Sequence, residues 1–254
     1  MLPAYGAFGE PRDRTGPPGH SYACLLVRLD TVTAAQVRTV LRAVRFTGWL
    51  APPERGWSVV IAERGAGTVA ARRLGIVGVG EALAVGREAT VLALRVYRDR
   101  QLLIAAWHRG DPVGTYVSDP SQDHPDQRDI LDEPVGVELA PALAAACGRP
   151  EVSEELTDVL GEPLDPDSVI ESERLLRVLR LLDLPAWLVA VPSLPHDIPT
   201  GPSRRELTRL GGGGEGVRGA LGRIATEPVR KRRRQPPAVP DAPRQEVDID
   251  PWLM

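Results

Sequence analysis

Aromatic side chains are scarce in this chain, because Phe, Trp and Tyr make up only 4% of its 254 residues. The core is therefore expected to be built from Leu, Val, Ala and Ile. Cysteine is rare too: only Cys24 and Cys147 occur, and neither belongs to a C-x-x-C or Cys/His pattern. Two thiols allow at most one disulfide, so a disulfide framework is excluded. We expect two small buried residues in a reducing compartment.

Long hydrophobic runs are also missing from the sequence. No stretch approaches the roughly 18 consecutive apolar residues that cross a bilayer. The N-terminal segment, residues 1–14, lacks the basic region followed by an apolar region that marks a secretory signal. These absences predict a soluble, cytoplasmic protein that does not interact with membranes.

Lysine is almost absent as well, since Lys231 is the only one although Lys and Arg together number 31. Arginine in place of lysine, with abundant Ala, Gly, Pro and Val, is typical of high-GC genomes and suggests an actinobacterial source. The formal net charge is −3. This value predicts no general attraction of the whole chain to nucleic acid or to anionic membranes.

Three segments with the composition of β-strands follow one another closely, at residues 90–97, 102–107 and 113–117. The polar turns between them are only a few residues long. Such short connections join antiparallel strands only, because a parallel return needs a dozen or more residues. The sequence therefore predicts a β-meander near residues 90–117 and argues against a doubly wound parallel sheet.

The remaining apolar patterns complete a mixed domain. Strands are expected at residues 22–29 and 57–62, and helices at 33–44, 67–85, 139–146, 152–160 and 169–182. We predict an α+β domain over residues 21–191, in which a mainly antiparallel sheet is covered by helices. Residues 1–20 and 192–254 are rich in Pro and Gly, so we expect a flexible N-terminal arm and a disordered Pro/Gly/Arg-rich C-terminal tail.

The end of the predicted domain, ERLLRVLRLLDLPAW at residues 173–187, carries a resemblance. A helix followed by L-x-L-P and an aromatic residue resembles a segment that closes the α+β domain of uncharacterised actinobacterial proteins. The resemblance covers roughly residues 22–191 and is one of pattern. It implies the α+β fold, and it implies no activity, cofactor or site residue.

Two patterns in the predicted domain could bind a ligand. Gly65-Ala-Gly-Thr-Val-Ala70 is a G-x-G-x-x-A variant of the dinucleotide-binding turn, although no acidic residue ends the next strand and no further βα unit follows. The loop between Asp119 and Glu133 holds several carboxylates and His124, but it lacks the calcium-loop pattern. A solvated acidic loop explains it better, so we assign no cofactor and no metal ligand.

One pattern could support catalysis. His108 ends a predicted strand beside Trp107 and lies close to Asp111, so it could act as a general base with an acidic partner. A polar residue at a hairpin turn explains His108 equally well. Because no paired catalytic constellation is present, we assign no catalytic residue.

The tail carries the features best suited to binding a partner. These are the basic run Arg230, Lys231, Arg232, Arg233 and Arg234 and the apolar terminus Trp252, Leu253 and Met254. Basic side chains can neutralise phosphates, and an apolar cluster can dock into a groove. The favoured hypothesis is a non-enzymatic accessory protein that binds a protein partner. A small-molecule-binding or hydrolytic enzyme with a site near Trp107, His108 and Asp111 is the alternative, and nucleic-acid binding through residues 230–234 is the third.

Overall fold

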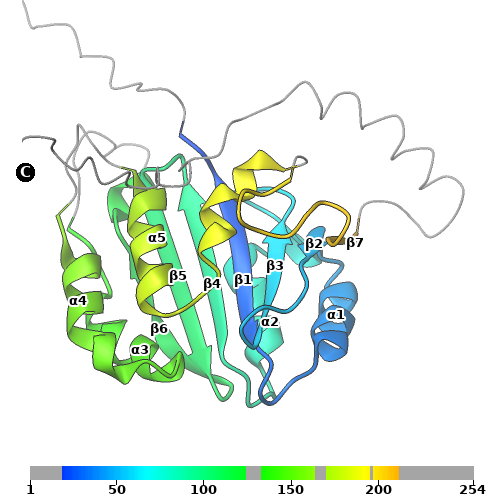
Figure 1. Ribbon diagram of the computed structural model, residues 1–254, viewed down its shortest axis with the longest axis horizontal. Coiled ribbons are helices and arrows are strands. Elements are labelled where there is room, and N and C mark those ends of the chain that lie inside the picture. Colours follow the sequence, from blue (N-terminus) through cyan, green and yellow to red (C-terminus); the bar gives the residue numbers. More distant parts are fainter. Residues whose placement is uncertain (1–18, 124–132, 164–169, 195–196, 212–254) are drawn as a thin grey trace, which may run out of the picture.

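A single antiparallel sheet organises the chain. The computed structural model describes residues 19–123, 133–163, 170–194 and 197–211, and in this part seven strands lie in the order β6-β5-β4-β1-β3-β2-β7 (Figure 1). The strands are β1 (Tyr22–Arg28), β2 (Gly48–Leu50), β3 (Trp57–Ala62), β4 (Val91–Tyr97), β5 (Gln101–His108), β6 (Asp111–Val117) and β7 (Thr208–Leu210). All neighbouring pairs are antiparallel. The predicted fold class and the β-meander, which is β4–β5–β6, are both confirmed.

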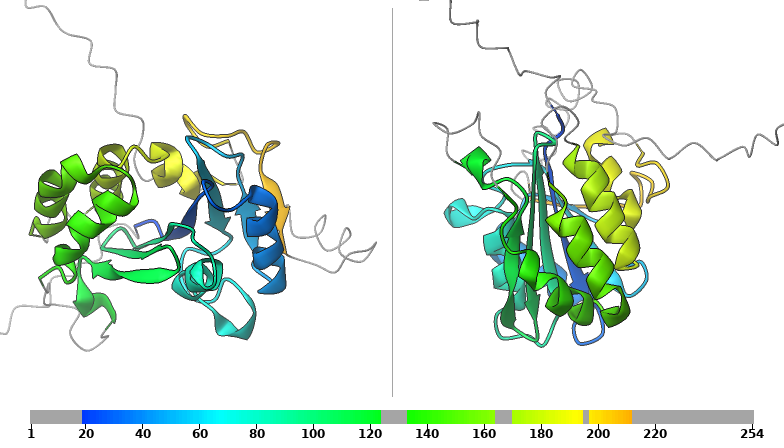
Figure 2. Two further views of the ribbon diagram at one scale, coloured as in Figure 1. Left: turned by 90° about the horizontal axis from the view of Figure 1, so that it is seen from below. Right: turned by 90° about the vertical axis from the view of Figure 1, so that its left-hand side faces the viewer.

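Helices cover both faces of the sheet (Figure 2). One face packs against α1 (Ala34–Ala43) and α2 (Ile76–Ala84). The other packs against α3 (Ala140–Ala146), α4 (Ser153–Gly161), α5 (Glu171–Leu181) and the 3₁₀ segment η6 (Ala186–Ser193). Shorter 3₁₀ turns are η1 (Ala71–Arg73), η2 (Pro120–Asp123), η4 (Val137–Leu139) and η5 (Pro150–Val152). No helix of the described residues is long and apolar enough to cross a membrane.

Strand β1 shows why its sequence is a nearly continuous apolar run. Successive side chains of a strand point to opposite faces. Cys24 and Leu26 therefore enter the core under α3, α4 and α5, whereas Leu25 and Val27 enter the core under α1 and α2. Because both faces are covered, every one of these positions must be apolar. Cys24 and Cys147 are both buried free thiols.

Helix α1 is defined by its first turn and by one apolar face. Thr33 is the N-cap: its Oγ1 accepts a hydrogen bond from the Gln36 N–H, and the Gln36 side chain accepts one from the Thr33 N–H. This reciprocal capping box satisfies two of the N–H groups that lack a partner inside the helix. Val37 and Leu41 form the buried face.

The folded region extends beyond residue 191, where the sequence analysis placed its end. Strand β7 pairs with β2, and Ile198, Leu207 and Leu210 are buried in the core. Three residues are too few to show a strand periodicity, and the prolines around them suggested a tail. The short strand β2 was missed for the same reason. Residues 1–18 and 212–254, which hold most of the predicted arm and tail, lie outside the described part of the chain.

We expect Leu210→Ala to lower the free energy of unfolding by about 2 kcal/mol or more, because it deletes a buried side chain of the core under α1 and α2. Urea unfolding of the full chain measures the effect. Thr208→Ala, on the same strand but exposed, is the matched control and should change stability by less than about 0.5 kcal/mol. Equal, negligible effects of both changes would show that β7 does not belong to the cooperative fold.

Candidate functional site

The structure places His108 opposite Asp111 in the β5–β6 hairpin, with Trp107 next to His108 on β5. Trp107 is buried beneath α2, so closely that a Cβ added to Gly80 would lie 2.8 Å from its ring. His108 Nδ1 lies 2.8 Å from Thr90 Oγ1. Asp111 is exposed on the edge strand β6. None of the three lines the cavity described below.

The acidic loop and the tail fall largely outside the described residues. Asp119 is the exception: it is buried, and its Oδ1 accepts a hydrogen bond from Ser121 Oγ at 2.5 Å. Across the described segments, no group of three or more His, Cys, Asp or Glu residues is placed to hold a metal ion. The predicted partner-binding residues of the tail, 230–234 and 252–254, cannot be placed and remain predictions.

The G-x-G-x-x-A segment does border a cavity, but in a fold unlike a dinucleotide-binding one. That fold requires parallel strands, and all strand pairs of the described sheet are antiparallel. A Cβ on Gly65 would lie 1.9 Å from the Ser21 carbonyl oxygen, and Gly67 has a φ of +76°. Both glycines are therefore required by the backbone path. We call residues 65–69 the glycine loop.

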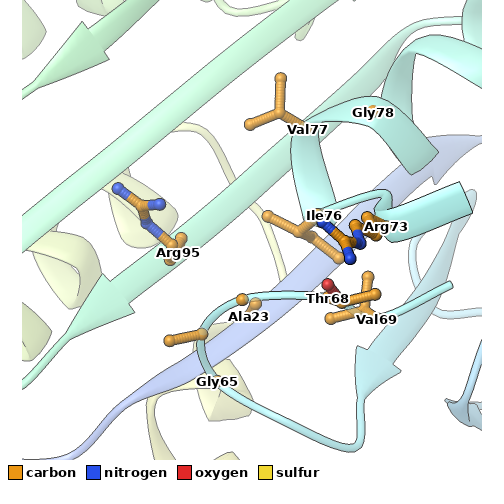
Figure 3. A pocket seen from close by; sticks show the side chains of 12 residues that line it. Ala23, Gly65, Thr68, Val69, Arg73, Ile76, Val77, Gly78 and Arg95 are labelled. Atoms are coloured by element: carbon orange, nitrogen blue, oxygen red, sulfur yellow. The ribbon is translucent and has the colours of Figure 1, made fainter.

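The cavity has a volume of about 380 Å³ and lies between the glycine loop, the start of α2 and the sheet (Figure 3). Residues 65–69 and 75–78 form most of its wall, and Ala23 of β1, Arg95 of β4 and Arg73 of η1 complete it. None of the described residues in its wall is Asp or Glu. Two arginines thus line a small space to which the described part of the chain contributes no carboxylate.

The N-terminus of α2 forms part of the same wall. Its N-cap is Gly75, which has no side chain to accept a hydrogen bond from the first turn, and that turn contains no acidic residue. The first N–H groups of a helix have no partner within the helix. Those of Ile76, Val77 and Gly78 belong to residues that line the cavity. The partial positive charge of the helix end therefore adds to that of the two arginines.

Arginines also gather on the segments next to the cavity, and one of them, Arg73, lines it. Six of them are exposed, and we call them the arginine surface: Arg38, Arg42, Arg45, Arg64, Arg72 and Arg73. Arg38 and Arg42 lie four residues apart on the exposed side of α1, and Arg45 directly follows the C-cap Val44. The Ala71 N–H donates to the Val44 carbonyl at 2.9 Å, which holds the turn carrying the last two against the end of α1.

The arginine surface has no neutralising acids of its own. Among the described residues, none of the six arginines forms an ion pair or a side-chain hydrogen bond. Two acidic residues of nearby segments are engaged elsewhere: Glu63 pairs with Arg209, and Glu54 accepts a hydrogen bond from Trp187 Nε1. Sequence reasoning missed this surface, although the 3–4 spacing of arginines on the helix predicted from residue 33 was a usable signal.

A separate polar cluster is buried at the same end of the sheet, under the first turn of α5. Glu171 is only 1% exposed, and its Oε1 lies 3.3 Å from Arg174 Nε. Beside it, Ser172 donates a hydrogen bond to Asp99, and the Tyr22 hydroxyl donates to Ser172 Oγ at 2.9 Å. Burial raises the pKa of Glu171 to about 7, and the nearby Arg174 guanidinium offsets only part of that rise.

The raised pKa of Glu171 predicts a pH-dependent stability. The folded chain holds this proton more tightly than the unfolded chain, in which the carboxyl titrates near 4.5. Its contribution to stability is therefore full below pH 4.5 and is lost as the pH rises through about 7. Relative to Glu171→Gln, the native chain should lose stability across this interval, as measured by urea unfolding. The exposed neighbour Glu173→Gln is the control; parallel curves for native chain and Glu171→Gln would contradict the prediction.

Comparisons with known proteins add no assignment to this geometry: no family model matches the chain, and neither a curated protein nor a solved structure is significantly similar to it.

Proposed function

We propose that the protein is a non-enzymatic, cytoplasmic interaction protein whose folded domain binds an acidic protein partner through the arginine surface. One observation carries this proposal: six exposed arginines lie on neighbouring segments and form no ion pair within the described residues. Guanidinium groups bind carboxylates through two parallel hydrogen bonds, so such a surface is suited to Asp and Glu side chains.

An acidic protein is favoured over nucleic acid by the charge of the rest of the molecule. Domains that bind nucleic acid are usually strongly basic, whereas this chain has a net charge of −3. Exposed acids, among them Glu154, Glu155 and Asp158 on α4, would repel an extended phosphate backbone. A short acidic segment that covers only the arginine surface avoids this repulsion. Residues 230–234 of the tail remain a second basic element that could assist either partner.

The alternative of an enzyme with a site near Trp107, His108 and Asp111 is not favoured here: His108 does lie opposite Asp111, but none of the three lines the cavity described above. His108 contacts Thr90, Trp107 is packed under α2, and Asp111 lies on an exposed edge. A general base needs an accessible space next to it in which a substrate can be held.

The proposal predicts that the full chain binds fluorescent poly-L-glutamate and that binding weakens as salt rises. Arg38→Glu with Arg42→Glu should weaken it about tenfold, which corresponds to about 1.4 kcal/mol from two lost exposed ion pairs and the added repulsion. Anisotropy titration gives the dissociation constants. Arg109→Glu with Arg180→Glu makes the same change of charge at exposed positions away from the surface and serves as the matched control.

All these variants should also be measured with residues 230–234 changed to Gln, because the tail could bind a polyanion by itself. If changing residues 230–234 to Gln abolished all binding while the domain variants had no effect, the interaction would belong to the tail, and a role for the domain would be contradicted. Equal weakening by both charge reversals would show unspecific attraction. Tighter binding of duplex DNA than of poly-L-glutamate at the same ionic strength would favour the nucleic-acid hypothesis.

A further inference from the structure

We propose that the cavity between the glycine loop and α2 is a binding site for a small phosphorylated molecule. Its volume of about 380 Å³ lies in the range of small-ligand pockets, roughly 300 to 1,000 Å³. This value is at the small end of the range and suits a phosphate group with a compact organic substituent. The site shares Arg73 with the arginine surface, but Arg38 and Arg42, whose substitution tests the acidic partner, do not line the cavity.

Charge is the first argument for the phosphate. Arg73 and Arg95 both line the cavity, and no carboxylate of the described residues does. Arg73 forms no ion pair within the described residues. The Arg95 Nη2 donates to Gln101 Oε1 at 2.7 Å, a contact that orients its guanidinium group at the end of β4. Two arginines in one wall, of which Arg73 forms no ion pair in the described part of the chain, suit the negative charge of a phosphoryl group.

The backbone supplies the second argument. A Cβ at Gly67 would meet nothing within 4 Å and one at Gly75 only the Gly67 carbonyl oxygen at 3.5 Å, so the main chain of these two lining residues is open. Several amide groups of α2 and the two guanidinium groups can then donate to one ligand, and a phosphoryl group has three oxygens to accept such bonds. A carboxylate has only two oxygens and a single charge, so it uses this set of donors less fully.

Apolar residues complete the cavity and define the rest of the ligand. Ala23 and Val69 form part of the wall, together with Ile76 and Val77 of α2. These side chains are uncharged, so they give inorganic phosphate no advantage over a phosphate ester. We therefore expect phenyl phosphate to bind more tightly than inorganic phosphate, because its ring can contact this apolar wall.

Gly75 offers a substitution that separates ligand binding from folding. Its φ of −79° and ψ of −177° are allowed for any residue, and an added Cβ would lie 3.5 Å from the Gly67 carbonyl oxygen, an ordinary contact. In Gly75→Asp the carboxylate can cap the first turn of α2 and occupies the position of the ligand's charge. This variant should unfold at the same or a higher temperature and should not bind phosphate.

The experiment is a titration of the full-length ¹⁵N-labelled chain with inorganic phosphate and with phenyl phosphate, followed at the amides of Ile76, Val77 and Gly78. Saturable shifts are expected for the native chain. They should be absent in Gly75→Asp, and the dissociation constant should rise about tenfold in Arg73→Gln, the loss of one charge-assisted contact. Arg72→Gln removes the same charge from the adjacent residue, which does not line the cavity, and should leave the dissociation constant unchanged.

Three results would overturn the proposal. Unshifted α2 amides at millimolar phosphate would show that the cavity binds no phosphoryl group. Equal weakening by Arg72→Gln and Arg73→Gln would assign the attraction to the arginine surface as a whole. Tighter binding of a phosphoserine peptide than of phenyl phosphate would identify the phosphate as part of a protein partner instead of a small molecule. Poly-L-glutamate binding by Gly75→Asp reports separately on the proposed function, because Arg38 and Arg42 are intact in it.

Discussion

The double burial of strand β1 is the constraint on which the rest of the structure depends. β1 pairs with β3 along one edge and with β4 along the other, so it joins the β4–β5–β6 meander to the β3–β2–β7 half of the sheet. Its residues 22–27 are all buried, and they alternate between two helical layers. Each fully buried aliphatic side chain stabilises the fold by about 1.5–3 kcal/mol. A polar residue in this strand would weaken both cores or the junction between the two halves of the sheet.

The same strand places two polar features at one end of the sheet, on opposite faces. Ala23 contributes to the cavity on the α2 face, and Tyr22 hydrogen-bonds to Ser172 on the α5 face. A chain of contacts continues from the cavity, because Arg95 donates to Gln101, whose Nε2 donates to the Asp119 carbonyl oxygen at 2.8 Å. Charged and polar groups are thus held on rigid strands and helix ends, which is the arrangement that gives a binding site defined geometry.

Charge is distributed unevenly over the helices. The outer side of α1 and the turn next to it carry the unpaired arginines, whereas α4, against the other face of the sheet, exposes Glu154, Glu155 and Asp158. The net charge of −3 is therefore a poor guide to what the molecule attracts. An uneven distribution of this kind orients a charged partner during approach and discriminates against wrongly charged ones.

Local patterns in the sequence were sufficient for the α+β class, the β-meander and most helices, because short turns and side-chain periodicity depend only on residues close together in the chain. The three-residue strands β2 and β7 escaped detection, since each is held by pairing with a distant segment. The sequence pattern identified the glycines at 65 and 67, but it did not predict the cavity that they border. Only the tertiary structure places the turn at Ala71 against Val44 and brings Arg73 and Arg95 into the wall of one cavity, because each pair joins segments separated by more than twenty residues.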